Sequence, residues 1–278
     1  MAVNRVMNSR ILLSALCGAL LLGATLPTMA ADDFSWPALT SQNKPWLWWW
    51  WPGSAVNKAD ITSQLETFQQ AGVGGVQIIP IYGIKGGQAD YIKFLTPEWM
   101  DMMGYTVSQA RSLGMNVDMA LETGWCFGGP ASTKNDANAL VVERTFDVAG
   151  GASLDQTFPG GSIQALMAFG TNDAKLDLMG QLKADGSIHW TAPAGAWRVY
   201  AISQRFSGQN VKRAAPGGVG PMLNPFYPPA MADYLKWFDG AFDSYTGPKP
   251  HAVFQDSYEY QCNWSPDFFC AVQTVARV

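Results

Sequence analysis

Helix-like and strand-like segments alternate between residues 46 and 122, and this alternation limits the possible folds more than any other feature of the chain. Apolar residues recur at helical spacing in residues 58–71. Residues 74–82 form a near-continuous apolar run, which is the pattern of a parallel strand covered on both faces. A second helix is predicted for residues 96–113 and another strand for residues 116–122. This order predicts an α/β fold with a parallel sheet, most simply the start of a (β/α)8 TIM-type barrel.

The pattern changes at about residue 138. Four strand-like runs follow, separated by Gly-Gly pairs and Pro-Ala-Gly turns, and they cover residues 141–148, 163–169, 187–191 and 197–206. We therefore expect a first barrel segment in residues 31–137, a small antiparallel β-rich insertion in residues 138–207, and a barrel continuation in residues 208–278. A helix over residues 229–242 and a fourth strand over residues 252–255 belong to this continuation, so the prediction is a partial barrel of about four strand–helix units.

Two carboxylates follow the fourth predicted strand. Asp256 and Glu259 are interleaved with the aromatic residues Tyr258, Tyr260 and Trp264. In barrel enzymes the loops after the strands hold the reacting groups. A carboxylic acid can protonate a glycosidic oxygen, and aromatic rings pack on the apolar faces of sugars. The stretch therefore favours a sugar-cleaving site with Tyr258 and Trp264 in contact with substrate, although the same acids could be polar loop residues after a core strand.

Residues 46–51 contain five tryptophans. Because alternate side chains on a strand point to opposite faces, these rings do not all face one core. We expect Trp49 and Trp51 to contact a ligand, together with Trp125 in the loop after the third predicted strand. The alternative is that the tryptophans only pack a core.

Composition and the first 30 residues limit the location and the partners. With 48% hydrophobic and 14% charged residues, the chain is typical of a globular protein. Residues 1–30 resemble a signal peptide: two arginines precede an apolar segment, and Thr28-Met29-Ala30 provides a cleavage site. We therefore expect an exported protein, periplasmic or extracellular, without a membrane partner after cleavage. Cys17 could instead mark a lipoprotein, but Leu16 before it is not the small residue usual at such sites.

Removal of this segment takes away two of the 18 basic residues and leaves 16 against 22 acidic ones, a net charge of −6. Such a surface argues against nucleic acid or anionic lipid as a partner. The remaining cysteines are Cys126, Cys262 and Cys270, of which at least one must be unpaired; the last two could form a disulfide or be buried thiols. Two histidines, His189 and His251, exclude a multi-histidine zinc site.

Several segments together resemble the N-terminal part of the catalytic domain of glycoside hydrolase family 106, the α-L-rhamnosidase family. Their order and spacing make this resemblance specific, and it covers most of residues 45–269. The matching segments are the Trp48–Trp51 run, residues 61–65 and 72–76, Leu113-Gly114, residues 124–130, residues 190–197, residues 212–218 and Asp256-Ser-Tyr-Glu259.

The resemblance implies a (β/α)8 barrel that hydrolyses terminal α-L-rhamnosides of plant-type polysaccharides or glycosides with inversion, helped by calcium. It implies that Glu259 is the general acid and Asp256 its essential neighbour. A like charge at Asp256 is expected to raise the pKa of Glu259, which suits an acid that holds its proton near neutral pH. Carboxylates at strand ends are the candidates for calcium, without an assigned ligand set: Asp118, Glu122, Asp256 and Glu259.

Two features depart from the family pattern. Trp50 stands where the family commonly has a histidine, so we do not expect a sugar contact there. Residues 270–278 do not resemble the family's continuation, and family members are much longer. We therefore expect a truncation or frameshift near residue 270, a general base beyond it, and an inactive or incomplete fragment. The alternatives are a non-catalytic carbohydrate-binding protein built on the tryptophans, or another barrel glycosidase related to β-galactosidases or β-glucuronidases.

Overall fold

A computed structural model describes residues 36–158 and 163–276. The expected signal peptide, with Cys17, lies outside the described residues. Backbone contacts group the chain into residues 1–39 and residues 40–278, and all elements named below belong to the second group. In the part of the chain that is described, no helix has the length and the apolar character needed to cross a membrane.

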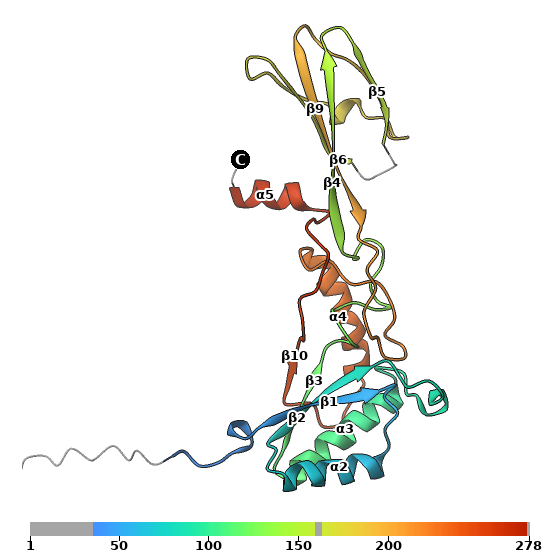
Figure 1. Cartoon of the computed structure of the whole chain (residues 1–278), viewed down its shortest axis with the longest axis vertical. Helices are drawn as coiled ribbons and strands as arrows, with labels where there is room; N and C mark the ends of the chain where they lie inside the picture. Colours follow the sequence, from blue (N-terminus) through green and yellow to red (C-terminus); the bar gives the residue numbers. More distant parts are fainter. Residues whose placement is uncertain (1–35, 159–162, 277–278) are drawn as a thin grey trace, which may run out of the picture. The chain divides into compact units, whose positions relative to one another are not determined.

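A four-stranded parallel sheet contains the strands expected from the sequence (Figure 1). Its order is β1-β2-β3-β10, and each neighbouring pair is parallel. The bounds are β1 Trp46–Pro52, β2 Gly75–Ile81, β3 Asn116–Ala120 and β10 Ala252–Phe254. The predicted parallel α/β sheet is therefore confirmed. Within the described residues these four strands form an open sheet and not a closed barrel.

The helices predicted between the strands are also present. They are α2 Lys58–Gln70, α3 Pro97–Ser112 and α4 Pro228–Phe242. The Asn57 side chain accepts a hydrogen bond from the Asp60 amide at the start of α2, and Thr96 caps α3 in the same way, with proline as the first helical residue. The other helical elements in the described residues are α5 Phe268–Ala276 and the short 3-10 helices η1 Ser41–Asn43, η2 Gln88–Asp90 and η3 Met179–Gln181.

The main core lies between the parallel sheet and its helices. Because strand side chains alternate, Trp49 and Trp51 point to the helix side, where Trp51 contacts Trp99 of α3 at a ring-centroid distance of 6.0 Å. Trp48 and Trp50 point to the other side and are 54% and 45% exposed. One strand thus supplies both the core and an exposed aromatic face.

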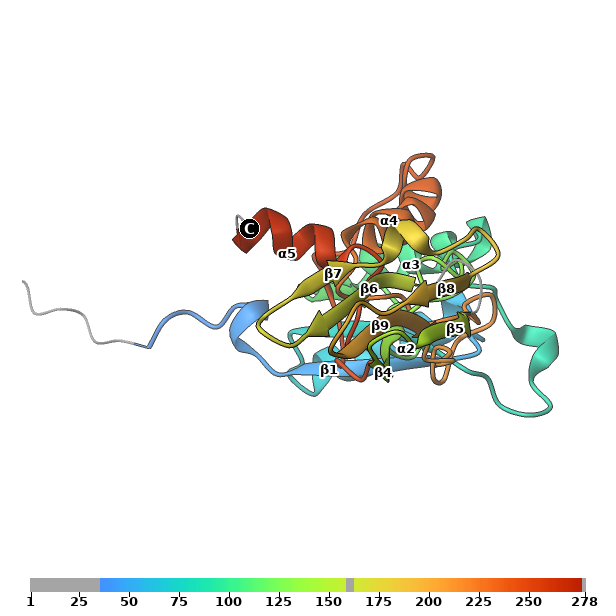
Figure 2. The ribbon, with the colours of Figure 1, turned by 90° about the horizontal axis from the view of Figure 1, so that it is seen from above.

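A second region consists of antiparallel strands (Figure 2). It has a core of its own around Leu166, Trp190 and Val199. One sheet has the order β4-β9-β6-β7, and β5 pairs with β8. The four runs predicted from the sequence are β4 Ala139–Ala149, β6 Ile163–Gly170, β8 Ser187–Thr191 and β9 Ala196–Phe206. Two further strands, β5 Ser153–Thr157 and β7 Lys175–Asp177, were not predicted, because these segments are short and mostly polar.

Two long loops, after β3 and after β9, pair through their backbones. Trp125 and Lys212 exchange two hydrogen bonds, with N···O distances of 3.0 and 2.8 Å, and Gly128 pairs with Met222. Gly124 permits this approach: its φ is +64°, and a Cβ there would lie 2.0 Å from the Lys212 carbonyl oxygen. The glycine-rich segment 124–130 is therefore required by close backbone packing.

We predict that Gly124→Ala destabilises the chain by about 2 to 4 kcal/mol, because it adds a steric clash to the strain of a positive φ. Gly86→Ala is the matched control, since Gly86 has a φ of +94° and open space around it. The control carries the strain alone, about 1 to 2 kcal/mol. Urea unfolding of both variants measures the difference, and equal losses would contradict a tight contact at Gly124.

Candidate active site

Three carboxylates lie at the carboxyl edge of the parallel sheet. Glu122 follows β3 by two residues and Asp256 follows β10 by two residues, and these two strands are neighbours. Glu259 lies three residues further along the same loop as Asp256. Ligands of parallel α/β sheets bind at this edge, because the loops there converge while the strands hold them in place.

Glu122 has the most perturbed carboxylate of the three. Its side chain is fully buried, one oxygen (Oε1) accepts a hydrogen bond from the Asp256 amide at 2.8 Å, and the other (Oε2) has no partner in the structure. Burial raises the pKa of Glu122 to about 7, with a smaller contribution from the Asp256 charge and an opposing one from the amide. From the sequence Glu122 was predicted only as a calcium candidate, although an acid just after a buried parallel strand is itself a signal of a functional site.

Asp256 is half-buried between two other acids. Burial raises the pKa of its carboxyl group, and the nearby Glu259 charge raises it further. Glu122 and Asp256 therefore both favour their protonated forms more than an ordinary carboxylic acid does.

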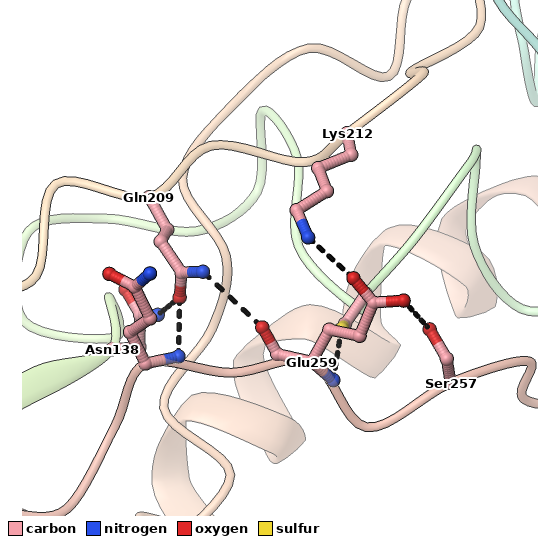
Figure 3. A network of polar contacts seen from close by, with 7 residues as sticks. Asn138, Gln209, Lys212, Ser257 and Glu259 are labelled. Carbon is pink, nitrogen blue, oxygen red and sulfur yellow. Dashed lines mark hydrogen bonds and ion pairs between the residues drawn. The ribbon is translucent and has the colours of Figure 1, made fainter.

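Glu259 behaves in the opposite way (Figure 3). The Lys212 ammonium group pairs with its Oε2 at 2.5 Å, and the Ser257 hydroxyl donates to its Oε1 at 3.3 Å. The hydrogen bond from Lys212 lowers the pKa of Glu259. The expected rise of this pKa is wrong for this structure, because the contacts with Lys212 and Ser257 lower it.

The backbone of the acidic loop is held by side chains from two other segments. The Glu259 amide donates to the Cys126 sulfur at 3.0 Å, and the Glu259 carbonyl oxygen accepts from Gln209 Nε2 at 3.3 Å (Figure 3). Gln209 also accepts from the Gln261 amide and from Asn138 Nδ2, both at 2.6 Å. The loops after β3 and β9 therefore fix the position of the Asp256–Glu259 segment.

The aromatic residues predicted to contact substrate fall into two groups. Tyr258 is 62% exposed and packs edge-on against Tyr260, and the half-exposed Trp125 packs edge-on against Trp50. Trp49 and Trp51, by contrast, are 7% and 0% exposed. Their predicted contact with a ligand is corrected, because the strand turns both rings into the helix-side core.

Trp264 lies on a different part of the loop. Its ring stacks on Phe268 of α5 at 4.1 Å, and its indole nitrogen donates to Gln164 of β6 at 2.6 Å. Together with Phe226 and three aliphatic residues of α5, these rings line an apolar hollow of about 510 Å³. The Trp264 ring thus packs mainly among apolar side chains, and its indole nitrogen does not bond to Glu122, Asp256 or Glu259.

The four candidate calcium ligands do not form one site in this structure. Asp118 pairs with His251 at 3.1 Å and Glu259 with Lys212, so Glu122 and Asp256 are the two that come together. Among the residues described, His, Cys, Asp and Glu side chains nowhere gather in groups of three or more suited to a metal. In this arrangement the four side chains do not fit one calcium centre together. Cys126, Cys262 and Cys270 are all free thiols.

Comparison with known proteins identifies a family. A family model described as glycoside hydrolase family 106, alpha-L-rhamnosidase, matches residues 38–166 and 168–274. The match includes the glycine-rich loop, the antiparallel strands and the Asp256–Glu259 segment. It also includes residues 270–274, which corrects the expectation that the family pattern stops at residue 269.

Two individual proteins are similar to the chain over most of its length. A putative beta-glucuronidase of Formosa agariphila is 22% identical over 288 aligned residues, which cover 84% of this chain and 24% of that protein. The solved structure of a rhamnosidase from Novosphingobium sp. PP1Y superimposes with a TM-score of 0.70 at 17% identity, covering 87% of this chain and 41% of that one. The chain therefore spans about a quarter of the curated relative and two-fifths of the solved structure, and the second similarity shows the shared fold.

We predict that Glu122 makes stability depend on pH. Since its folded-state pKa of about 7 exceeds its ordinary value of 4.5, the native state binds more protons than the unfolded state between these values. The unfolding free energy therefore falls as the pH rises through this window. Glu122→Gln, which mimics the protonated acid, should match the wild type at pH 4.5 and exceed it at pH 8 by about 2 to 3 kcal/mol.

Urea unfolding at the two pH values measures this effect, and Glu66→Gln on the exposed face of α2 is the control. The same difference between wild type and Glu122→Gln at both pH values would show that Glu122 does not titrate in this window.

Proposed function

Since this chain belongs to glycoside hydrolase family 106, the α-L-rhamnosidase family, we propose that it forms the acid-bearing part of an enzyme that removes terminal α-L-rhamnose from plant-type polysaccharides or glycosides with inversion. The observation that carries the proposal is the group of Glu122, Asp256 and Glu259 at the carboxyl edge of a parallel sheet. Export through the signal-like residues 1–30, to the periplasm or the outside, suits a polymeric carbohydrate substrate.

We infer that the parallel sheet is the first four strands of a (β/α)8 barrel. Four parallel strands in sequence order, with α2 and α3 between them, support this inference. The exposed Trp48 and Trp50 would then face the barrel interior, with Trp50 near the end of β1 that leads into the site. The residues 138–207 would form an insertion between the third and fourth barrel units.

In this proposal Glu259 donates its proton to the glycosidic oxygen as the bond to the anomeric carbon breaks, and water attacks that carbon from the opposite face. Inversion requires a second carboxylate about 6.5–9.5 Å from the acid to accept the proton of that water. Asp256 supports the acid electrostatically, and Tyr258 and Trp125 offer exposed ring surfaces to the sugar.

The ion pair with Lys212 bears directly on this role. It favours the charged form of Glu259, whereas a general acid must hold a proton. Both side chains are about half exposed, and exposed ion pairs contribute little to stability. The pair can therefore separate at little cost when a substrate enters.

A second candidate function is the hydrolysis of β-glucuronides, which the name of the Formosa agariphila relative favours. A third, non-catalytic binding of carbohydrate, rests on the exposed Trp48 and Trp50 rings. Binding of this kind would survive Glu259→Gln and be lost on Trp50→Ala.

We predict that an enzyme that contains this chain together with the general base cleaves 4-nitrophenyl α-L-rhamnoside and not the corresponding β-D-glucuronide or β-D-galactoside. Glu259→Gln should lower kcat on a substrate with a poor leaving group about 10²- to 10⁴-fold, because proton donation is then required for departure. Glu66→Gln serves as the control. Turnover of the glucuronide alone would support the second candidate, and nearly full activity of Glu259→Gln would exclude Glu259 as the acid.

We predict that Lys212→Met moves the basic limb of the kcat/KM pH profile to higher pH. The Lys212 contact lowers the pKa of Glu259, so its removal lets the acid keep its proton at higher pH. Lys236→Met, which breaks the exposed pair with Asp233, is the control. An unchanged basic limb in Lys212→Met would argue that a group other than Glu259 is the acid.

A further inference from the structure

The two acids of the Asp256-x-x-Glu259 segment are both held through their backbone amides. Each has its backbone amide bound by a buried acceptor from the loop after β3: Glu122 Oε1 accepts from Asp256 at 2.8 Å, and Cys126 Sγ accepts from Glu259 at 3.0 Å. Both acceptor side chains are fully buried. Two residues four apart in one loop thus hold both ends of a four-residue segment in the neighbouring loop.

The two acceptors provide hydrogen-bond partners for backbone amides that would otherwise have none in the sheet. After Phe254 the chain leaves the sheet, so the amides of residues 256 and 259 have no partner in a strand ladder. A partly buried amide without a partner costs about as much as a lost hydrogen bond. Glu122 and Cys126 supply these partners from a loop that is itself fixed by the backbone pairing of Trp125 with Lys212. Burial raises the pKa of Cys126, so its sulfur is a neutral thiol at this position.

We propose that Glu122 and Cys126 are positioning residues that fix the Asp256–Glu259 segment for proton donation. The proposal rests on the proposed function and deepens it. Neither residue needs to touch the sugar, because each acts through a backbone amide. The requirement is an acceptor atom at each position: the carboxylate can be replaced by an amide, and the thiol by a hydroxyl, without losing the contact.

Paired variants test this requirement. Glu122→Leu and Cys126→Ala remove the acceptors, whereas Glu122→Gln and Cys126→Ser keep them. Cys270→Ala, at an exposed cysteine of α5, is the control. Each protein is assayed with aryl α-L-rhamnosides of good and poor leaving groups, and hydrogen exchange of the amides in residues 256–259 is measured by mass spectrometry.

We expect the variants without acceptors to lose kcat roughly 10- to 100-fold on the poor leaving group, with a smaller loss on the good one and little change in KM. Exchange in residues 256–259 should be faster in these two variants, while the variants that keep an acceptor remain within about fivefold of the wild type in kcat. A misplaced acid explains the dependence on the leaving group, which a general loss of structure does not.

Equal losses on both substrates, or wild-type exchange in Glu122→Leu and Cys126→Ala, would overturn the proposal. If Glu122→Leu fails to fold, the comparison of Cys126→Ala with Cys126→Ser decides it. Failure of the proposed function appears separately, as a wild-type protein without rhamnosidase activity. Hydrogen exchange still reports on the two amide contacts in that case.

Discussion

The close backbone contact between the loops after β3 and β9 determines the geometry of the candidate site. It brings Lys212 beside Trp125, the neighbour of Cys126. Lys212 then pairs with the Glu259 carboxylate, and the Cys126 sulfur accepts a hydrogen bond from the Glu259 amide. The contact depends on the absence of a side chain at Gly124, where even a methyl group would overlap the Lys212 carbonyl oxygen. The glycines of the loop therefore act on the chemistry indirectly, by letting two backbones approach closely enough for their neighbours to meet.

Three acids at one sheet edge would repel one another if all were ionised. In this structure their pKa values are shifted in different directions. Burial raises the pKa of Glu122 and Asp256, whereas Lys212 lowers that of Glu259. Pairs of carboxyl groups with pKa values pushed in opposite directions are typical of acid–base sites. Lys212 favours the charged form of Glu259, so the electrostatics of the site depend on a residue that lies 47 positions earlier in the sequence.

Much of the fold follows from local patterns. The apolar run at β2, the cap at Asn57 and the Thr96-Pro97 start of α3 each act within a few residues, so the sequence predicts them well. The strand at residues 46–52 was predicted, but which of its faces is buried depends on where α2 and α3 pack, and the assignment of Trp49 and Trp51 to a ligand was therefore wrong. Likewise the pKa of Glu259 depends on Lys212, a contact that no local pattern encodes.

Glu122 illustrates why a site can be partly hidden in a sequence. In the sequence, an acid after a strand looks like an ordinary loop residue. Only the tertiary structure shows that Glu122 is buried, with one oxygen bonded to an amide and the other unpaired. Burying such a group destabilises the folded chain at neutral pH, which a purely structural acceptor such as glutamine would avoid. A buried acid that carries this cost and also bonds to the Asp256 amide is a candidate for a role in the site.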